Sequence, residues 1–149
     1  MRRRPATILY ADDDPDDRML TADAMRHSRL AHRLEEVEDG SQLLAYLRRQ
    51  GQWADPDRSP RPGLILLDLN MPGIDGRQAL TAIKADPQLA AIPVVVLTTS
   101  QAASDIAACY EVGASSYIAK PVTFSGLVQV MADLGHYWFE VVLLPAEAA

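Results

Sequence analysis

Short apolar runs alternate along the chain with segments whose apolar residues recur at helical spacing. The run Leu64-Ile65-Leu66-Leu67 lies between Pro62-Gly63 and Pro72-Gly73, which is typical of a fully buried strand. Other segments carry apolar residues three and four positions apart, as amphipathic helices do. The pattern predicts strands at 7–11, 34–37, 64–67, 93–98 and 116–119. It predicts a helix that begins near residues 14–15, a second that begins near residue 41, and three more that span about 76–85, 101–112 and 123–139.

Five strand-then-helix units predict an α/β fold, a parallel sheet with helices on both faces. Five units are too few for an eight-fold barrel, so we expect an open, doubly wound sheet with strand order 2-1-3-4-5. The 149 residues suit a single domain, 1–149, with a core of about 6–139 and a C-terminal tail of about 140–149.

Composition and charge exclude several classes of protein. The formal net charge of -6 gives no electrostatic support to nucleic-acid binding. The basic start, residues 1–5, is not followed by the apolar core of a signal peptide, and no apolar stretch is long enough to span a bilayer. Cys109 is the only cysteine, so an intrachain disulfide is impossible, which fits a cytoplasmic location.

Polar side chains follow several of the predicted strands. Asp12 and Asp13 follow the first strand, Asp68 the third, and Lys120 the fifth, while Thr98 ends the fourth. Open α/β sheets bind ligands at this carboxyl edge, and strand order 2-1-3-4-5 brings the three acids together. Unpaired carboxylates in one crevice repel and raise each other's pKa values. A hard divalent cation would compensate, with Mg²⁺ the preferred occupant and Lys120 as a second positive charge.

A simpler interpretation treats the acids after the first strand as an acidic helix start. We adopt it for Asp14, Asp16 and Asp17, which would complement the helix dipole. For Asp12 and Asp13 the site is the better interpretation, because other chemistry-bearing residues recur at matching strand ends.

Four segments together resemble a receiver domain, the phospho-accepting module of two-component response regulators. They are Ile8-Leu9-Tyr10-Ala11-Asp12-Asp13, Leu66-Leu67-Asp68-Leu69-Asn70-Met71-Pro72 with Asp75-Gly76, Val96-Leu97-Thr98, and Tyr117-Ile118-Ala119-Lys120-Pro121. Residues 92–100, Asp105-Ile106 and 138–145 further resemble the stand-alone receivers associated with bacterial phytochromes. The resemblance implies the flavodoxin-like (βα)5 sheet and a C-terminal extension.

The resemblance also implies a role for each acid of the site. Asp68 would be the nucleophile that accepts a phosphoryl group from a sensor histidine kinase, a bacteriophytochrome being one candidate. Asp13, Asp68 and the backbone carbonyl of Asn70 would ligate Mg²⁺ directly, and Asp12 would act mostly through water. The protein would signal by conformational switching and protein–protein contacts. It would be a phosphoprotein that catalyses its own phosphorylation and dephosphorylation and is otherwise not an enzyme.

The remaining implied roles concern phosphoryl binding and the switch. Lys120 would bind a phosphoryl oxygen, Thr98 would hydrogen-bond the phosphoryl group, and Tyr117 would follow by changing rotamer. A cis bond before Pro121 would direct Lys120 into the site.

Two alternatives from other classes stay open at this point. A haloacid-dehalogenase type phosphatase also uses a strand-end aspartate and Mg²⁺, but needs Asp-x-Asp after its first strand. A flavodoxin-like cofactor module needs a phosphate loop where residues 12–17 are acidic. The histidines, His27, His32 and His136, could accept phosphate but lie in no helix-bundle pattern.

The C-terminal part predicts a homodimer. Phe124, Leu127, Met131, Leu134 and Trp138 recur at helical spacing and should face the sheet. This leaves apolar residues that would form a large patch in water, and a two-fold contact through the fourth helix, fifth strand, fifth helix and tail would cover it. The interface candidates are Val130, Tyr137, Val141, Val142, Leu143 and Leu144. The alternative is a tail that folds back on its own domain.

Overall fold

The computed structural model describes residues 6–28 and 33–145. The basic start, His32 and the last part of the predicted tail, residues 146–149, lie outside the described residues. The five predicted strands form one parallel sheet in the order β2-β1-β3-β4-β5, which confirms the predicted fold class and strand order. The strands are β1 (Thr7–Ala11), β2 (Arg33–Val37), β3 (Leu64–Leu67), β4 (Val94–Thr98) and β5 (Ser116–Ala119).

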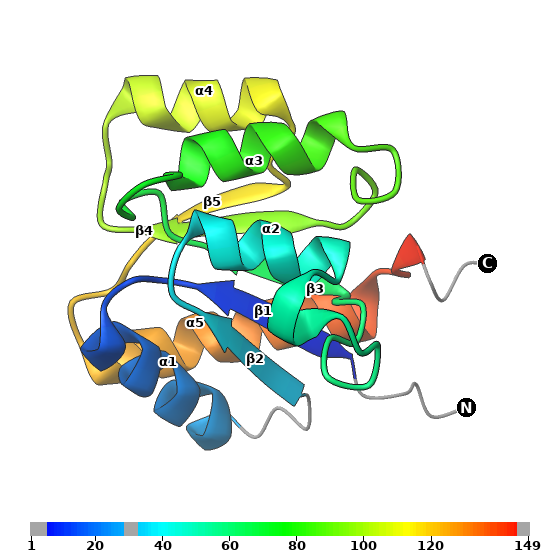
Figure 1. The fold of residues 1–149 in the computed structure, drawn as a ribbon. Helices are drawn as coiled ribbons and strands as arrows, with labels where there is room; N and C mark the ends of the chain where they lie inside the picture. Colours follow the sequence, from blue (N-terminus) through cyan, green and yellow to red (C-terminus); the bar gives the residue numbers. More distant parts are fainter. Residues whose placement is uncertain (1–5, 29–32, 146–149) are drawn as a thin grey trace.

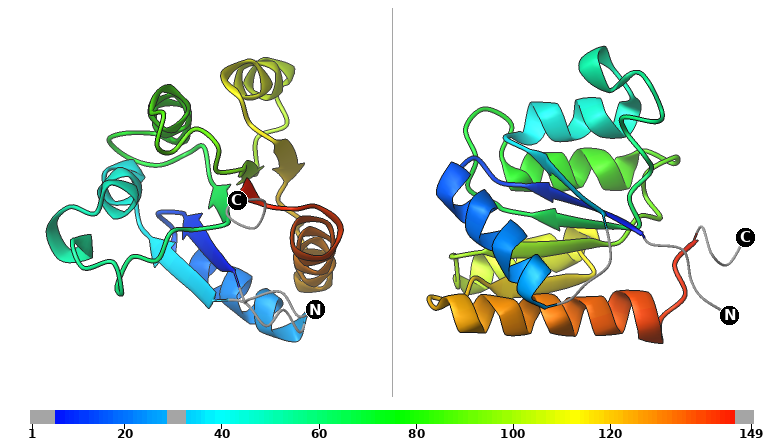
Figure 2. Two further views of the ribbon diagram at one scale, coloured as in Figure 1. Left: turned by 90° about the vertical axis from the view of Figure 1, so that its right-hand side faces the viewer. Right: turned by 90° about the horizontal axis from the view of Figure 1, so that it is seen from below.

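Helices cover both faces of this sheet. In Figure 1, α2, α3 and α4 lie above the sheet, and α1 and α5 lie below it. The view from below in Figure 2 shows α1 and α5 covering the same face. The main helices are α1 (Pro15–His27), α2 (Gly40–Arg48), α3 (Gly76–Ala85), α4 (Ala103–Val112) and α5 (Phe124–His136). A 3-10 helix η1 (Gly51–Trp53) begins the long loop, and a π-helical segment η2 (Tyr137–Val141) follows α5.

Each face of the sheet buries its own core. Successive strand residues point to opposite faces of the sheet. Leu9 of β1 therefore belongs to the core between the sheet and α2, α3 and α4, while Ile8 and Tyr10 belong to the core between the sheet and α1 and α5. All residues of β1, β3 and β4 are buried, which explains why these strands have near-continuous apolar sequences. In the described part of the chain, no helix has both the length and the apolarity that crossing a bilayer requires.

The predicted apolar stripe of the last helix is correct in its middle and wrong at its start. Leu127, Met131 and Leu134 are buried against the sheet. Phe124 does not face the sheet: it is the first residue of α5, where the helix has only just begun, and its ring packs edge-on against His27 of α1 at 5.2 Å. Trp138 is partly buried against the same core.

The tail divides between the core and solvent. Leu144 is buried, and its side chain lies so close to Gly63 that a Cβ added there would come within 2.8 Å of Leu144 Cδ1. The expectation that Leu144 remains for a dimer contact is therefore wrong, because this residue folds back onto its own domain. Tyr137, Val141 and Leu143 are exposed.

Candidate functional site

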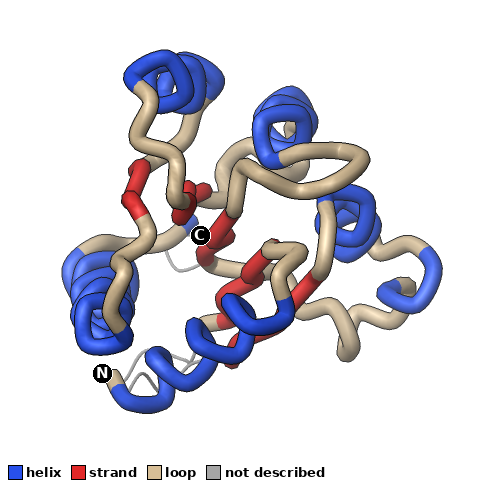
Figure 3. The backbone as a smooth tube through the Cα atoms, turned by 90° about the vertical axis from the view of Figure 1, so that its left-hand side faces the viewer, coloured by secondary structure: helices blue, strands red, loops and turns tan. Residues whose placement is uncertain are grey.

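The carboxyl edge of the sheet brings Asp12 and Asp68 side by side. Ala11 pairs with Leu67 in the register of β1 and β3, so the next residue of each strand is an aspartate. The pairing continues one step further, since the Asp68 N–H donates to the Ala11 carbonyl oxygen at 3.0 Å. Figure 3 views the molecule from this edge. The strand register, and not a flexible loop, therefore fixes the separation of these two carboxylates.

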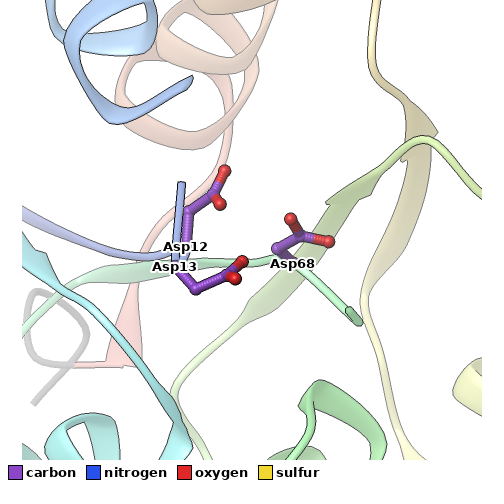
Figure 4. Close-up of side chains that lie close together, drawn as sticks. All are labelled: Asp12, Asp13 and Asp68. Atoms are coloured by element: carbon purple, nitrogen blue, oxygen red, sulfur yellow. The ribbon is translucent and has the colours of Figure 1, made fainter. Parts of the chain in front are cut away.

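Asp12, Asp13 and Asp68 form a compact acidic cluster. One carboxylate oxygen from each lies within 4.8 Å of those of the other two, and Figure 4 shows the three side chains gathered where the chain leaves β1 and β3. Asp12 and Asp68 are buried, whereas Asp13 is exposed. Oxygen ligands with one side open to water are the donor set that hard divalent cations prefer. The residues therefore fit a cation of the Mg²⁺ type.

Lys120 supplies the positive charge of the site. Its Nζ donates to Asp12 Oδ2 at 2.6 Å, to Asp17 Oδ2 at 3.0 Å and to Asp68 Oδ2 at 3.2 Å. Burial works against the charged form of Lys120, but the hydrogen bond to Asp12 and the negative charges of Asp68 and Asp12 oppose burial, and its pKa lies above the ordinary value. The ammonium is therefore a fixed charge at neutral pH.

The predicted cis bond before Pro121 is wrong, because every described peptide bond is trans. The placement of Lys120 has another cause. Its backbone N–H donates to the Thr98 carbonyl oxygen at 2.8 Å, which continues the β4–β5 pairing one residue beyond the end of β5. This pairing directs Lys120 toward the acidic cluster without a cis bond.

Both carboxylate oxygens of Asp68 accept hydrogen bonds, Oδ2 from Lys120 and Oδ1 from two further donors. The Thr98 hydroxyl donates to Asp68 Oδ1 at 3.0 Å, and the Asn70 backbone N–H donates to the same oxygen at 3.1 Å. Burial raises the pKa of the Asp68 carboxyl, against the lowering effect of Lys120 and the Asn70 N–H. Close packing fixes the backbone too: a Cβ on Gly76 would come within 2.3 Å of the Asp68 carbonyl oxygen.

Tyr10 is a site residue that the sequence analysis counted only as part of a strand. Its hydroxyl donates to Asp12 Oδ2 at 2.6 Å, and the Thr21 hydroxyl donates in turn to the Tyr10 oxygen at 3.3 Å. Burial raises the pKa of Tyr10, so the phenol stays protonated as a donor. The two-residue spacing of Tyr10 and Asp12 could have indicated this role, because residues two apart on a strand point to the same face of the sheet.

Asp17 has a larger role than the helix-dipole one that the sequence suggested. It does lie in the first turn of α1, whose N-cap Asp14 accepts from the backbone N–H groups of Asp16 and Asp17. Its side chain also reaches Lys120. Residues 17 and 120 are too distant in sequence for any local pattern to predict this contact.

A second set of hydrogen bonds holds the segment that follows β4. The Tyr117 hydroxyl donates to the Ser100 carbonyl oxygen at 2.9 Å, and the Ser100 hydroxyl donates to Asp105 Oδ2 at 2.6 Å. Arg77 of α3 donates to Asp105 Oδ1 at 2.7 Å. The hydrogen bond from Ser100 and, to a smaller extent, that from Arg77 lower the pKa of Asp105. Tyr117 thus contacts the segment that follows Thr98.

This arrangement suits phosphoryl transfer. The Asp68 carboxylate stands beside an ammonium, a hydroxyl and a donor set for a divalent cation. Transfer of a phosphoryl group requires positioning and neutralisation of its oxygens more than covalent chemistry by the protein.

Comparisons with known proteins agree with this chemistry. The family model of the response regulator receiver domain matches residues 8–132. Response regulator Rcp1 of Synechocystis sp. is 40% identical over 142 residues, which cover 95% of this chain and 95% of Rcp1. The crystal structure of the phosphorylated cyanobacterial phytochrome response regulator RcpA has a TM-score of 0.88 and 39% identity, and covers 95% of this chain and 99% of RcpA. The Mn²⁺-bound form of Rcp1 has a TM-score of 0.84 and 40% identity, with the same coverage, 95% and 99%.

Proposed function

Because the chain belongs to the response-regulator receiver family, with phytochrome-associated receivers among its relatives, we propose that it accepts a phosphoryl group from a sensor histidine kinase at Asp68. The observation that carries the proposal is the placement of Asp68, whose carboxylate contacts Lys120 and Thr98 and adjoins Asp12 and Asp13. Family membership favours this function over the phosphatase and the flavin module.

The reaction is an in-line displacement. An oxygen of the Asp68 carboxylate attacks the phosphorus of a phosphohistidine, a P–O bond forms, the P–N bond breaks, and the imidazole leaves with the electron pair and takes up a proton. Lys120 neutralises one phosphoryl oxygen, and the Thr98 hydroxyl donates to another. Dephosphorylation at the same site would be hydrolysis of the acyl phosphate by water.

Asp12, Asp13, Asp68 and the Asn70 carbonyl are the groups that would hold Mg²⁺. When bound, the cation would supply positive charge to the transferring phosphoryl oxygens. The Mn²⁺-bound form of Rcp1 supports a divalent cation in a related receiver, and the carboxylate set here suits Mg²⁺ equally.

Phosphorylation of Asp68 would signal through a change in the conformation of the segment that follows β4. A phosphoryl group on Asp68 would draw the Thr98 hydroxyl away from Asp68 Oδ1, and the segment held by Tyr117 and Ser100 would move with it. Signalling then proceeds through contacts of this surface with other proteins. The proposal places the chain in the cytoplasm, in agreement with its single, buried cysteine, Cys109.

A homodimer is part of this proposal. Tyr137, Val141 and Leu143 expose apolar surface next to α5, and a second copy of the chain would cover it. Val130 and Val142 are only partly exposed and would contribute at the edge. Sedimentation of Leu143→Ser against Met19→Ser, a matched exposed apolar residue on α1, tests this contact: a selective loss of dimer in Leu143→Ser supports it, and a monomeric wild type at micromolar concentration overturns it.

Transfer from a kinase tests the proposed function. An autophosphorylated sensor kinase, with phytochrome kinases included in the panel, is mixed with wild type or with Asp68→Asn in the presence of Mg²⁺. Loss of label from at least one kinase and its gain by the wild type alone is the expected result. Equal labelling of both proteins would contradict the proposal.

A further inference from the structure

The ammonium group of Lys120 has no hydrogen-bond donor to spare. An ammonium carries three N–H donors, and the structure shows three carboxylate acceptors, on Asp12, Asp17 and Asp68. A phosphoryl oxygen that is to be bound by Lys120 must therefore replace one of these partners.

Asp17 is the partner that can leave at the lowest cost. Asp12 is completely buried and lies closest to the ammonium, and Asp68 is the acceptor of the phosphoryl group itself. The Asp17 side chain is 38% exposed, so water can solvate its carboxylate once the contact with Lys120 is broken. Asp17 is also outside the group of three acids suited to hold a cation.

The surroundings leave room for such a movement. Asp17 and Lys120 both line a surface pocket of about 120 Å³ between α1 and the start of α5, together with Pro121 and Leu20. The Asp17 side chain therefore borders open space into which its carboxylate would move on leaving Lys120.

We propose that Asp17 is a positioning residue for Lys120: it occupies one N–H donor of the ammonium in the unphosphorylated chain and yields that donor to a phosphoryl oxygen when Asp68 is phosphorylated. The inference rests on the proposed function. It assigns Asp17 the role of an exchangeable counter-ion, which disfavours phosphorylation while holding Lys120 in place. The exchange is of hydrogen-bond partners only and requires no additional reactant.

Asp16 provides a matched control. It lies beside Asp17 in the first turn of α1, carries the same charge and is exposed. Asp16→Asn and Asp17→Asn therefore remove equal charge from the same helix end, but only Asp17→Asn removes a partner of Lys120. Asp17→Glu keeps the charge on a side chain one methylene longer and should restore the contact.

The first measurement does not depend on phosphorylation. The chain has two lysines, Lys84 and Lys120, so ¹⁵N-lysine labelling gives two ammonium signals in an NMR spectrum. Asp17→Asn should shift the Lys120 signal and leave Lys84 unchanged, because Lys84 donates to the carbonyl oxygens of Ala90 and Ile92. A Lys120 signal that is the same in wild type and Asp17→Asn would overturn the inference.

The second measurement follows phosphorylation by acetyl phosphate with Mg²⁺. Asp17→Asn should lower the half-saturating donor concentration by roughly two- to fivefold, the factor that corresponds to an ion pair with one exposed partner. Asp16→Asn and Asp17→Glu should stay close to wild type. Equal effects of Asp16→Asn and Asp17→Asn would overturn the exchange alone, whereas a wild type that takes up no phosphoryl group would overturn the proposed function and the exchange with it.

Discussion

Removal of the Asp13 charge should stabilise the cation-free protein. Asp13→Asn keeps the size of the side chain and removes one of three negative charges whose oxygens lie within 4.8 Å of one another. At that separation each pair repels by about 1 kcal/mol in a water-like environment and about 3.5 kcal/mol at an effective dielectric constant of 20. Asp13 is exposed, so the lower value applies to its repulsion by Asp12 and by Asp68.

The positive charge of Lys120, which contacts Asp12 and Asp68, opposes part of this repulsion. The net gain for Asp13→Asn is then about 1 kcal/mol, which corresponds to a rise of about 2–4 °C in the melting temperature of a chain of this size. Mg²⁺ should reverse the order of the two melting temperatures, so that wild type melts above Asp13→Asn. A ligand at one hundred times its dissociation constant stabilises by about 2.7 kcal/mol, and only the wild type keeps the full ligand set.

Differential scanning calorimetry at low ionic strength, with and without Mg²⁺, tests both signs. Asp57→Asn, an exposed acid in the loop before β3, is the matched control and should show neither effect. The reasoning fails if Asp13→Asn melts below wild type without cation, or if Mg²⁺ stabilises it as much as it stabilises wild type.

Two further predictions concern packing and pH. Leu144→Ala should destabilise the chain by about 2 kcal/mol because Leu144 is buried, whereas Met19→Ala, at an exposed residue outside the proposed dimer contact, should change stability by less than about 0.5 kcal/mol. Chemical denaturation checks both, and equal effects would contradict the fold-back of the tail. Burial raises the pKa of Tyr46 to about 12 from its ordinary value of 10.0, while its hydroxyl donates to the Pro60 carbonyl oxygen. The folded-state pKa is the higher one, so this stabilisation is complete below pH 10 and is lost as pH rises toward 12, and Tyr46→Phe should remove that part of the alkaline loss of stability in denaturation curves between pH 10 and 12.

The fold could be predicted because its strands are short apolar runs between turn residues. Buried parallel strands need apolar side chains on both faces, so β1, β3 and β4 stand out in the sequence without any knowledge of their partners. The acidic cluster followed from the same pattern, since Asp12 and Asp68 terminate two of these runs and the strand order makes them neighbours.

Other features depended on contacts that no local pattern reports. Helical spacing correctly placed Leu127 and Met131 in the core, but it could not show that Phe124 lies where α5 has barely begun to cover the sheet. The contact of Asp17 with Lys120 and the packing of Leu144 beside Gly63 join distant parts of the chain. Only the three-dimensional arrangement reveals them.

Identification of the residue that carries the phosphoryl group tests the central claim most directly. The wild type is incubated with acetyl phosphate and Mg²⁺, the acyl phosphate is trapped by reduction with borohydride, and the modified peptide is sequenced by mass spectrometry. The account predicts a single modified residue, Asp68, and no modification in Asp68→Asn or in wild type deprived of divalent cations. Modification of Asp12, Asp13 or a histidine in place of Asp68 would contradict it.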